Sequence, residues 1–451
     1  MKADKTSIIR DYILDLLEQE KLHDGQKIPG ARDIASITGV SFLKVQQGLE
    51  TLVRDGILET RGRTGTFIQN GWNLRILHDN ISIFRQQDSL PWLSGFQKMI
   101  ESSIPGLRFT HAFKQSMLEL KNTLYVQKNH EEFMDLSGIM KECFPARDQF
   151  FENAFSSFYT GDKLVGIPMA FSPRVIYFNP KWFEKAGCDM PSNGWTWDDF
   201  ISSIRQLKRV LPSDRVLNLL VQPHYWLNLV MRGGGHIFKN GEIAIGTPET
   251  KRSLKLFADL WKELDLFQLN KTYREAFIAG DAAMYIEGRQ FTSNLIARNV
   301  DWWDTVQLPL IPGGRDVSSQ ATDLICVRKS CTNLSLVKEF VKFMLSEKVQ
   351  DFLGKHKYAI PIRKSSAFKS IDLTDPRDSL FAVEMGKIET EPVAEHANIA
   401  NLLLAGLDKI LVDKMDIDSS IDQLVQVSKV FQSIQIHSKQ RNPEVELVSI
   451  I

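Results

Sequence analysis

The chain has 451 residues, of which 43% are hydrophobic and 24% charged, a balance typical of globular proteins with room for a small domain and one or two larger ones. Its 55 lysines and arginines equal its 55 aspartates and glutamates, so the chain as a whole lacks the basic excess that marks many nucleic-acid-binding proteins. The sequence has no apolar signal core at its N-terminus and no apolar run of about 18 residues, which argues against export or a membrane span and favours the cytoplasm.

The first 40 residues predict two helices. Apolar residues recur every three to four positions in residues 8–17, as they do on one face of a helix. A turn follows at Asp24-Gly25, and Pro29-Gly30 marks the start of a short second helix.

A third helix is predicted after Gly39, which supplies a tight turn, with Ser41 as the expected N-cap. Its buried stripe is expected to consist of Val45, Leu49 and Leu52. The opposite face carries Leu43, Lys44, Gln46, Gln47 and Glu50. A helix that recognises DNA is divided in this way, because it buries one face in its own domain and presents the other to the major groove.

Two strand-like runs, residues 57–60 and 66–68, flank the sequence Arg61-Gly62-Arg63-Thr64-Gly65. We expect a hairpin whose tip brings cations to DNA phosphates and whose glycines let the backbone approach the duplex.

These elements resemble the DNA-binding domain of the GntR family of bacterial transcriptional regulators. Besides the proline before the second helix, the matching landmarks are Arg32, Gly39-Val40-Ser41, Leu49 with Leu52, Asp55-Gly56-Ile57-Leu58 and Gly65-Thr66-Phe67. The resemblance implies a winged helix-turn-helix domain at residues 1–72 that binds double-stranded DNA. The residues it assigns to DNA contact are Arg32, Ser41, Leu43, Lys44, Gln46, Gln47, Arg61, Arg63, Thr64 and Gly65.

Two positions depart from this family, because Phe42 and Gln46 stand where arginines are frequent. The operator sequence therefore cannot be carried over from relatives, and a winged helix used for protein contact is the alternative. Residues 1–72 also hold ten lysines and arginines against ten aspartates and glutamates, although the cations cluster in the reading elements. We therefore expect tight DNA binding only from a homodimer.

Beyond a short linker, strand-like and helix-like segments alternate to the end of the chain. Strands are predicted at residues 74–83, 164–168 and 175–178, and helices at 92–102, 197–210, 248–264 and 334–345. This alternation predicts an α/β architecture with largely parallel sheets. The pair Asp198-Asp199 lies at the start of one of these helices, where the helix dipole stabilises negative charge, so we interpret the pair as structural rather than catalytic.

The same region resembles the family 1 extracellular solute-binding proteins, which deliver sugars and oligosaccharides to ABC importers. The resemblance depends on the order of its landmarks, which include Val165-Gly166-Ile167-Pro168, Ile176-Tyr177-Phe178-Asn179, Trp195-Thr196-Trp197, Gly233-Gly234-Gly235, Gly280-Asp281-Ala282-Ala283-Met284, Leu308-Pro309-Leu310 and Ala359-Ile360-Pro361. It implies a two-lobed fold of the type II periplasmic-binding-protein kind at residues 73–451. Lobe 1 would comprise about residues 73–170 and 325–375, and lobe 2 about residues 171–322 and 380–451, with a ligand held between them.

Sugar recognition requires aromatic faces and planar polar groups. The positions that the resemblance places near a ligand are Asp88, Trp92, Phe171, Ser172, Gln222, His224, Tyr225, Trp226, Glu287, Arg289, Trp302, Asp323 and His396. Several of these residues could instead be core or loop residues without a ligand role. This alternative applies most to Trp92 and to one of the pair Trp302-Trp303. Gln290 replaces the tryptophan of a stacking platform found in many relatives, which argues against an oligosaccharide.

The combination predicts a ligand-responsive transcriptional regulator that senses a small molecule of the carbohydrate class by lobe closure. One alternative is a regulator whose cleft no longer binds ligand and serves dimerisation. A fusion to a pyridoxal-dependent aminotransferase-like domain is disfavoured, because the lysine motif that such a domain needs is not found. We expect no enzymatic activity, no cofactor and no metal, since the four cysteines lack metal-site spacing.

Overall fold

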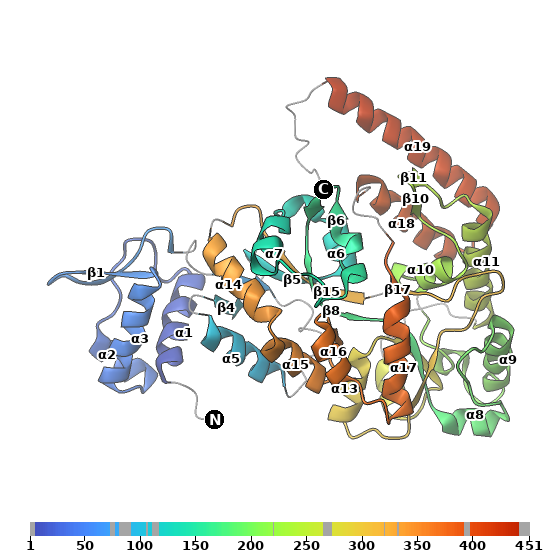
Figure 1. The fold of residues 1–451 in the computed structure, drawn as a ribbon, viewed down its shortest axis with the longest axis horizontal. Coiled ribbons are helices and arrows are strands. Elements are labelled where there is room, and N and C mark those ends of the chain that lie inside the picture. Colours follow the sequence, from blue (N-terminus) through green and yellow to red (C-terminus); the bar gives the residue numbers. More distant parts are fainter. Residues whose placement is uncertain are drawn as a thin grey trace.

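The computed structural model describes residues 5–72, 77–80, 92–104, 107–110, 117–219, 221–264, 273–319, 321–331, 333–391 and 397–441. A small helical domain with a β-hairpin lies at one end, and two sheets with their helices form the rest (Figure 1). No helix within these ranges combines the length and apolar character needed to cross a membrane.

The N-terminal domain has the predicted order of elements, with α1 (Lys5–Glu18), α2 (Ala31–Thr38), α3 (Phe42–Arg54), β1 (Leu58–Arg61) and β2 (Gly65–Ile68). β1 and β2 are antiparallel, and residues 26–28 pair with β2 on its other side, since Ile28 N donates to Thr66 O at 3.0 Å. The helices meet in one apolar core in which Ile9 and Leu52 are fully buried. Gly48 brings α3 against α1, because a Cβ there would lie 2.7 Å from Cβ of Ile9.

The first sheet of the larger region has six strands in the order β16-β8-β15-β5-β3-β4. Their bounds are β3 (Leu77–Asn80), β4 (Leu107–Thr110), β5 (Leu118–Asn122), β8 (Ile167–Ser172), β15 (Ala321–Val327) and β16 (Ile360–Pro361). β3 is parallel to β4 and β5, whereas β15 is antiparallel to β5 and β8, and β16 is antiparallel to β8.

The second sheet has three antiparallel strands, β12 (Met284–Glu287), β9 (Val175–Phe178) and β13 (Asp304–Gln307), with β9 in the middle. The prediction of largely parallel sheets is therefore wrong. The chain leaves the first sheet after β8, forms the second sheet and its helices, and returns to the first sheet at β15, which runs antiparallel to β8.

Helices surround both sheets. The helices that are next to strands of the first sheet in the sequence are α5 (Leu93–Ser103), α6 (Thr123–Lys128), α7 (Ser137–Cys143), α14 (Leu334–Met344), α15 (Glu347–Lys355) and α16 (Lys364–Ser370). Those that follow the strands of the second sheet are α8 (Pro180–Ala186), α9 (Trp197–Leu207), α10 (Pro223–Arg232), α11 (Pro248–Glu263), α12 (Tyr273–Ile278) and α13 (Gln290–Ala297).

The last three helices return to the second sheet. α17 (Pro376–Glu384) packs on β13, and α18 (Ala397–Val412) and α19 (Ile417–Arg441) pack on each other, with α19 also against α11. Short two-stranded pairs complete the structure, namely β6 (Tyr159–Thr160) with β7 (Lys163–Leu164), β10 (Phe238–Lys239) with β11 (Glu242–Ile243), and β14 (Ser318–Ser319) with β17 (Ile388–Glu389).

Two apolar cores lie on the two faces of the second sheet. Side chains alternate across a strand, so Ile176 and Phe178 of β9 enter one core while Tyr177 enters the other. The core of Tyr177 is continuous with that of the first sheet, so the two sheets are joined by apolar packing.

Asp199, the second residue of the acidic pair that opens α9, has the structural role expected of the pair. Thr196 donates to Asp199 Oδ2 from its backbone N at 2.8 Å and from Oγ1 at 2.7 Å. These hydrogen bonds hold the pKa of Asp199 below its ordinary value. Asp199 therefore caps α9.

Candidate functional site

The exposed side of α3 lies opposite its buried stripe. Val45 and Leu52 are buried and Leu49 is half-buried, whereas Leu43, Gln46 and Gln47 are exposed. This division is the one that the sequence predicts for a helix that presents polar side chains to a partner.

The other predicted contact residues of the helices also reach the surface, although not equally. Arg32, in the first turn of α2, and Ser41, before α3, are exposed, and Lys44 is half-buried. Ser41 occupies the N-cap position, but its side chain makes no capping hydrogen bond. Its hydroxyl is therefore available to a DNA phosphate or base.

The wing presents its cations differently. The guanidinium of Arg61 lies over the ring of Phe67, 4.3 Å from its centroid, and pairs with Glu59. Arg63 is exposed at the tip, where its φ of 62° is left-handed. Arg63 is thus an exposed cation at the tip of the wing, whereas the charge of Arg61 is partly neutralised by its ion pair with Glu59.

Thr64 and Gly65 shape the hairpin behind that tip. Thr64 Oγ1 donates to Arg61 O at 2.9 Å. Gly65 has a φ of 119°, and a Cβ there would lie 2.6 Å from Cε of Lys27, so glycine lets this lysine lie against the wing. Lys27 therefore adds a cation beside those of the hairpin.

In the larger region, predicted ligand residues gather where the chain crosses from β8 to β9. Glu287 ends β12 beside this crossing, and its carboxylate pairs with the guanidinium of Arg174. It also accepts hydrogen bonds from Gly288 N and Gln290 Nε2, both at 2.9 Å. The Glu287 side chain keeps 25% of its surface exposed, so part of this carboxylate faces solvent.

Tyr225 belongs to the same group. Its hydroxyl accepts a hydrogen bond from Asn218 Nδ2 at 2.9 Å. Burial and the nearby negative charge of Glu287 raise the pKa of Tyr225, so the hydroxyl stays protonated. Tyr225 is itself buried, so Glu287 is the member of this group whose carboxylate can accept hydrogen bonds from a polar ligand.

A second polar group lies on the first sheet. Asp323 on β15 is half-buried and accepts a hydrogen bond from the hydroxyl of Tyr358 at 2.6 Å. Burial raises the pKa of Asp323 to about 6, although the hydrogen bond from Tyr358 opposes the shift. This carboxyl therefore titrates just below neutral pH.

Trp92 links that group to the other sheet. Its ring lies 5.3 Å from that of Tyr358 and stacks on His356 at 5.5 Å, and its Nε1 donates to Ser293 Oγ of α13 at 3.2 Å. Only 7% of Trp92 is exposed, so it joins the two sheets rather than offering an open stacking face.

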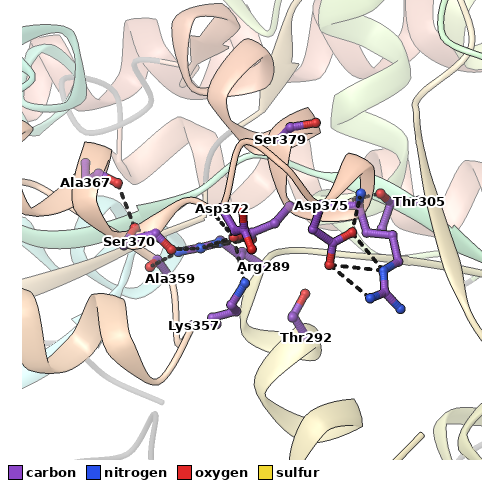
Figure 2. Close-up of polar contacts among 12 residues, drawn as sticks. Arg289, Thr292, Thr305, Lys357, Ala359, Ala367, Ser370, Asp372, Asp375 and Ser379 are labelled. Carbon is purple, nitrogen blue, oxygen red and sulfur yellow. Dashed lines mark hydrogen bonds and ion pairs between the residues drawn. The ribbon is translucent and has the colours of Figure 1, made fainter. Parts of the chain in front are cut away.

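Hydrogen bonds connect the buried Arg289, which directly precedes α13, to residues around Ala359 and Ser370 (Figure 2). Its guanidinium binds both carboxylate oxygens of Asp378 at 2.9 and 3.1 Å, and it donates to Ser370 O at 2.6 Å and to Ala359 O at 3.3 Å. Lys357 Nζ reaches the same carboxylate at 2.7 Å. Arg289 is fully buried and its guanidinium is occupied by these partners, so its assignment as a ligand contact stays a prediction that this conformation does not support.

The structure places two other predicted ligand residues in the core. Trp226 is fully buried, and its Nε1 donates to Asp408 Oδ1 at 2.7 Å, so it anchors α10 to α18. Phe171 is fully buried against Phe151, with ring centroids 5.3 Å apart.

Trp302 packs at one end of the second sheet. Its ring packs on Phe277 at 5.3 Å and lies beside Gly280, at the end of β12 away from Glu287. Trp303 is buried, as one of this pair was expected to be. Trp302 therefore lies at the end of this sheet opposite to Glu287, and its assignment to the ligand stays a prediction.

Ser172 and Gln222 lie on the crossing side. Ser172 is buried, and its Oγ accepts a hydrogen bond from the backbone N–H of Arg289. This hydrogen bond positions the backbone that leads into α13 rather than a ligand. Gln222 is half-buried at the start of α10. Asp88 and His396 lie outside the described residues, as does the side chain of His224, and their roles stay predictions.

The sequence analysis missed Arg174, Tyr358 and Asp378. Arg174 lies directly before the predicted strand at Val175, and Tyr358 lies directly before the Ala359-Ile360-Pro361 landmark. Their positions next to predicted elements could therefore have identified them. Asp378 gave no such signal, since it is 89 residues from its partner Arg289.

A small cavity lies inside the second core. It has about 20 Å³ of space, room for one water, and is lined mainly by apolar residues such as Ile176, Trp197 and Leu260. This cavity is therefore too small to hold a sugar.

Two family descriptions match this chain. Residues 5–68 match the bacterial regulatory proteins of the gntR family, and residues 133–351 match the bacterial extracellular solute-binding proteins. Both families are named for binding or regulation rather than for catalysis.

Curated relatives match only part of the chain. An arabinooligosaccharide-binding protein of Halalkalibacterium halodurans is 28% identical over 119 residues, 26% of this chain and 26% of that protein. The chain thus spans about a quarter of the length of this curated relative.

Solved structures match the fold over most of the chain. A solute-binding protein of Thermotoga Lettingae bound to α-D-tagatose has a TM-score of 0.66 at 16% identity, covering 78% of this chain and 98% of that one. A maltose-bound protein of T. maritima has a TM-score of 0.65 at 15% identity, covering 79% and 99%. The larger region therefore has the two-lobed type II periplasmic-binding-protein fold.

The chain thus joins a GntR-family DNA-binding domain, at residues 5–68, to a domain of the bacterial extracellular solute-binding protein type.

Proposed function

We propose that this protein is a cytoplasmic, ligand-responsive transcriptional regulator whose binding-protein domain senses a small carbohydrate. The observation that carries the proposal is the presence of both domains in one chain. A binding protein attached to a DNA-binding domain acts where the DNA is, so its ligand is a signal rather than a transported cargo.

The ligand class is supported by similarity and by side-chain chemistry. The two solved relatives are bound to tagatose and maltose, and the curated relative is named for an arabinooligosaccharide. The carboxylates of Glu287 and Asp323 are acceptors suited to sugar hydroxyls. Gln290 lacks an aromatic face, which favours a short sugar over an oligosaccharide.

Sensing requires that the ligand prefer one arrangement of the lobes. The contact of Trp92 with Ser293 and those of Arg289 with Ala359 and Ser370 join segments of the two sheets. Opening of the lobes would break these contacts. A ligand at the crossing would therefore shift the balance between open and closed forms.

A homodimer completes the proposal, and α19 offers the surface. This helix extends away from the body of the domain (Figure 1). Its first turns pack through the buried Ile417 and Ile421, but further along it exposes four large apolar side chains, Val427 (56%), Val430 (59%), Phe431 (39%) and Ile434 (60%).

These four residues form a stripe that is complementary to itself. They follow the spacing of three, four and seven positions that places side chains on one helix face. In an antiparallel pair with its two-fold axis between Val430 and Phe431, Val427 faces Ile434 of the partner subunit and Val430 faces Phe431 of the partner subunit. A contact of two helices is small, so we expect a concentration-dependent dimer that paired DNA half-sites strengthen.

Thermal melting against a panel of mono- and disaccharides tests the sensing function. A ligand at about 100 times its dissociation constant should stabilise the protein by ~2.7 kcal/mol. The variant Glu287→Gln should lose this shift, whereas Glu275→Gln, at an exposed glutamate paired with Arg298, should keep it. Equal shifts in both variants would contradict the site, and no shift with any sugar would favour the regulator whose cleft serves only dimerisation.

A further inference from the structure

The first turns of α3 expose a distinctive set of side chains. Phe42 and Leu43 open the helix with 45% and 64% of their surfaces exposed. Gln46 and Gln47 are exposed one turn later. Because residues three and four apart share a helix face, Leu43, Gln46 and Gln47 lie side by side.

The fully exposed residues of this face include no cation. Lys44 lies at its edge, three residues before Gln47, but is half-buried, and the next cation of α3 is Arg54, in the last turn. Arg32 belongs to α2, and Arg63 to the wing. The cations of the domain therefore surround the face rather than occupy it.

The chemistry of the bases gives this pattern a meaning. In helix-turn-helix proteins the N-terminal residues of the recognition helix contact base edges in the major groove. Arginine and lysine read guanine there, asparagine and glutamine read adenine through N6 and N7, and apolar side chains contact the C5 methyl group of thymine.

We propose that α3 reads A·T base pairs, with Leu43 on a thymine methyl group and Gln46 and Gln47 on adenine edges. Leu43, exposed on the free protein, then loses its contact with water when the helix enters the groove. Arg32 and Arg63 hold the phosphates. The inference depends on the proposed DNA-binding function and adds the class of operator.

Selection of binding sites from a randomised duplex library, with the full-length protein at one fixed salt concentration, provides the first arm of the test. We expect half-sites whose central positions are A·T pairs. Enrichment of G·C pairs at those positions would overturn the inference while leaving DNA binding intact. Failure to bind any duplex would overturn the DNA-binding function together with it.

Replacement of each selected thymine by uracil is the second arm, because it removes only the C5 methyl group. We expect about fourfold weaker binding at one thymine per half-site, the value of burying one methyl group. Leu43→Ala should bind the thymine and uracil duplexes equally, whereas Ile8→Ala, at an exposed residue of α1, should still distinguish them. Retention of the thymine preference by Leu43→Ala would overturn the role of Leu43.

Substitution of the glutamines separates adenine from thymine recognition. Gln46→Ala or Gln47→Ala should lose roughly tenfold in affinity for the selected duplex and should relax the preference for adenine, as expected when a bidentate base contact is removed. An equal loss on all sequences would show that the glutamines contact phosphates instead, which would overturn the adenine assignment.

Discussion

Polar side chains on the exposed face of α3 and polar side chains near the crossing from β8 to β9 differ in whether the protein already binds them. Gln46 and Gln47 are exposed, whereas Glu287 is bound by Arg174 and Asp323 by Tyr358. Under the proposed function, the face of α3 is thus formed before DNA arrives, whereas a ligand at the crossing would compete with contacts that the protein already makes. This difference is what a sensor requires, because replacing internal contacts couples binding to a change of conformation.

Arg289→Ala should have the largest effect, because it tests the buried side of this comparison. The substitution leaves the carboxylate of Asp378 buried with Lys357 as its remaining cation, and breaking a buried pair typically costs about 3–5 kcal/mol of unfolding free energy. Denaturant unfolding measures this loss. Arg377→Ala is the matched control, since its pair with Asp375 is half-exposed and should cost under ~1 kcal/mol. Similar losses in both would contradict the role of Arg289 as a buried link.

The double variant Arg32→Ala, Arg63→Ala tests the exposed side. Each phosphate contact removed should lower the slope of log affinity against log salt by about one, so we expect a reduction of about two. Fluorescence anisotropy at several salt concentrations provides the slope. Arg298→Ala, an exposed arginine of the larger region, should leave it unchanged. An unchanged slope in the double variant would mean that another face binds DNA.

Asp323→Asn should give a smaller effect that depends on pH. The folded pKa of about 6 lies above the ordinary value of 3.8, so the protonated carboxyl stabilises the fold at low pH and this contribution is lost as pH rises through 6. The asparagine variant lacks this loss, so relative to the natural protein it should gain on the order of 1–2 kcal/mol between pH 4.5 and 7.5. Parallel stability curves for the two proteins would contradict the raised pKa.

Val430→Asp tests the homodimer and should have the smallest effect on the isolated domains. A charge in the middle of the α19 stripe should shift sedimentation toward the monomer and weaken binding to paired half-sites, with folding unchanged. Val412→Asp, at an equally exposed valine at the end of α18, should leave the dimer intact. If both variants sediment like the natural protein, α19 is not the dimer surface.

The winged helix was predictable because its signals are local. Gly39 ends α2 in the left-handed conformation, and the apolar spacing of α3 identifies its buried stripe. In the larger region, segments such as 175–178 were placed correctly as strands, but their directions depend on where the chain returns to each sheet. Sequence periodicity indicates where a strand lies but not which sheet it joins or in which direction it runs.

The candidate ligand site was less predictable than the fold. The resemblance indicated that Glu287 and Asp323 lie near a ligand, but not which protein groups their carboxylates bind. The partner of Trp226 is 182 residues away, and that of Glu287 is 113 residues away. Whether a side chain faces a ligand or a distant helix is decided by such long-range pairs.

The most direct test of the account is the coupling between the two domains. The affinity for a selected operator duplex would be measured with and without the sugar that gives the largest melting shift, and the affinity for that sugar with and without the duplex. The account predicts that each ligand changes the affinity for the other by the same factor, roughly 5- to 150-fold. Equal affinities in all four measurements would show that the domain binds sugar without controlling DNA, and would contradict the account.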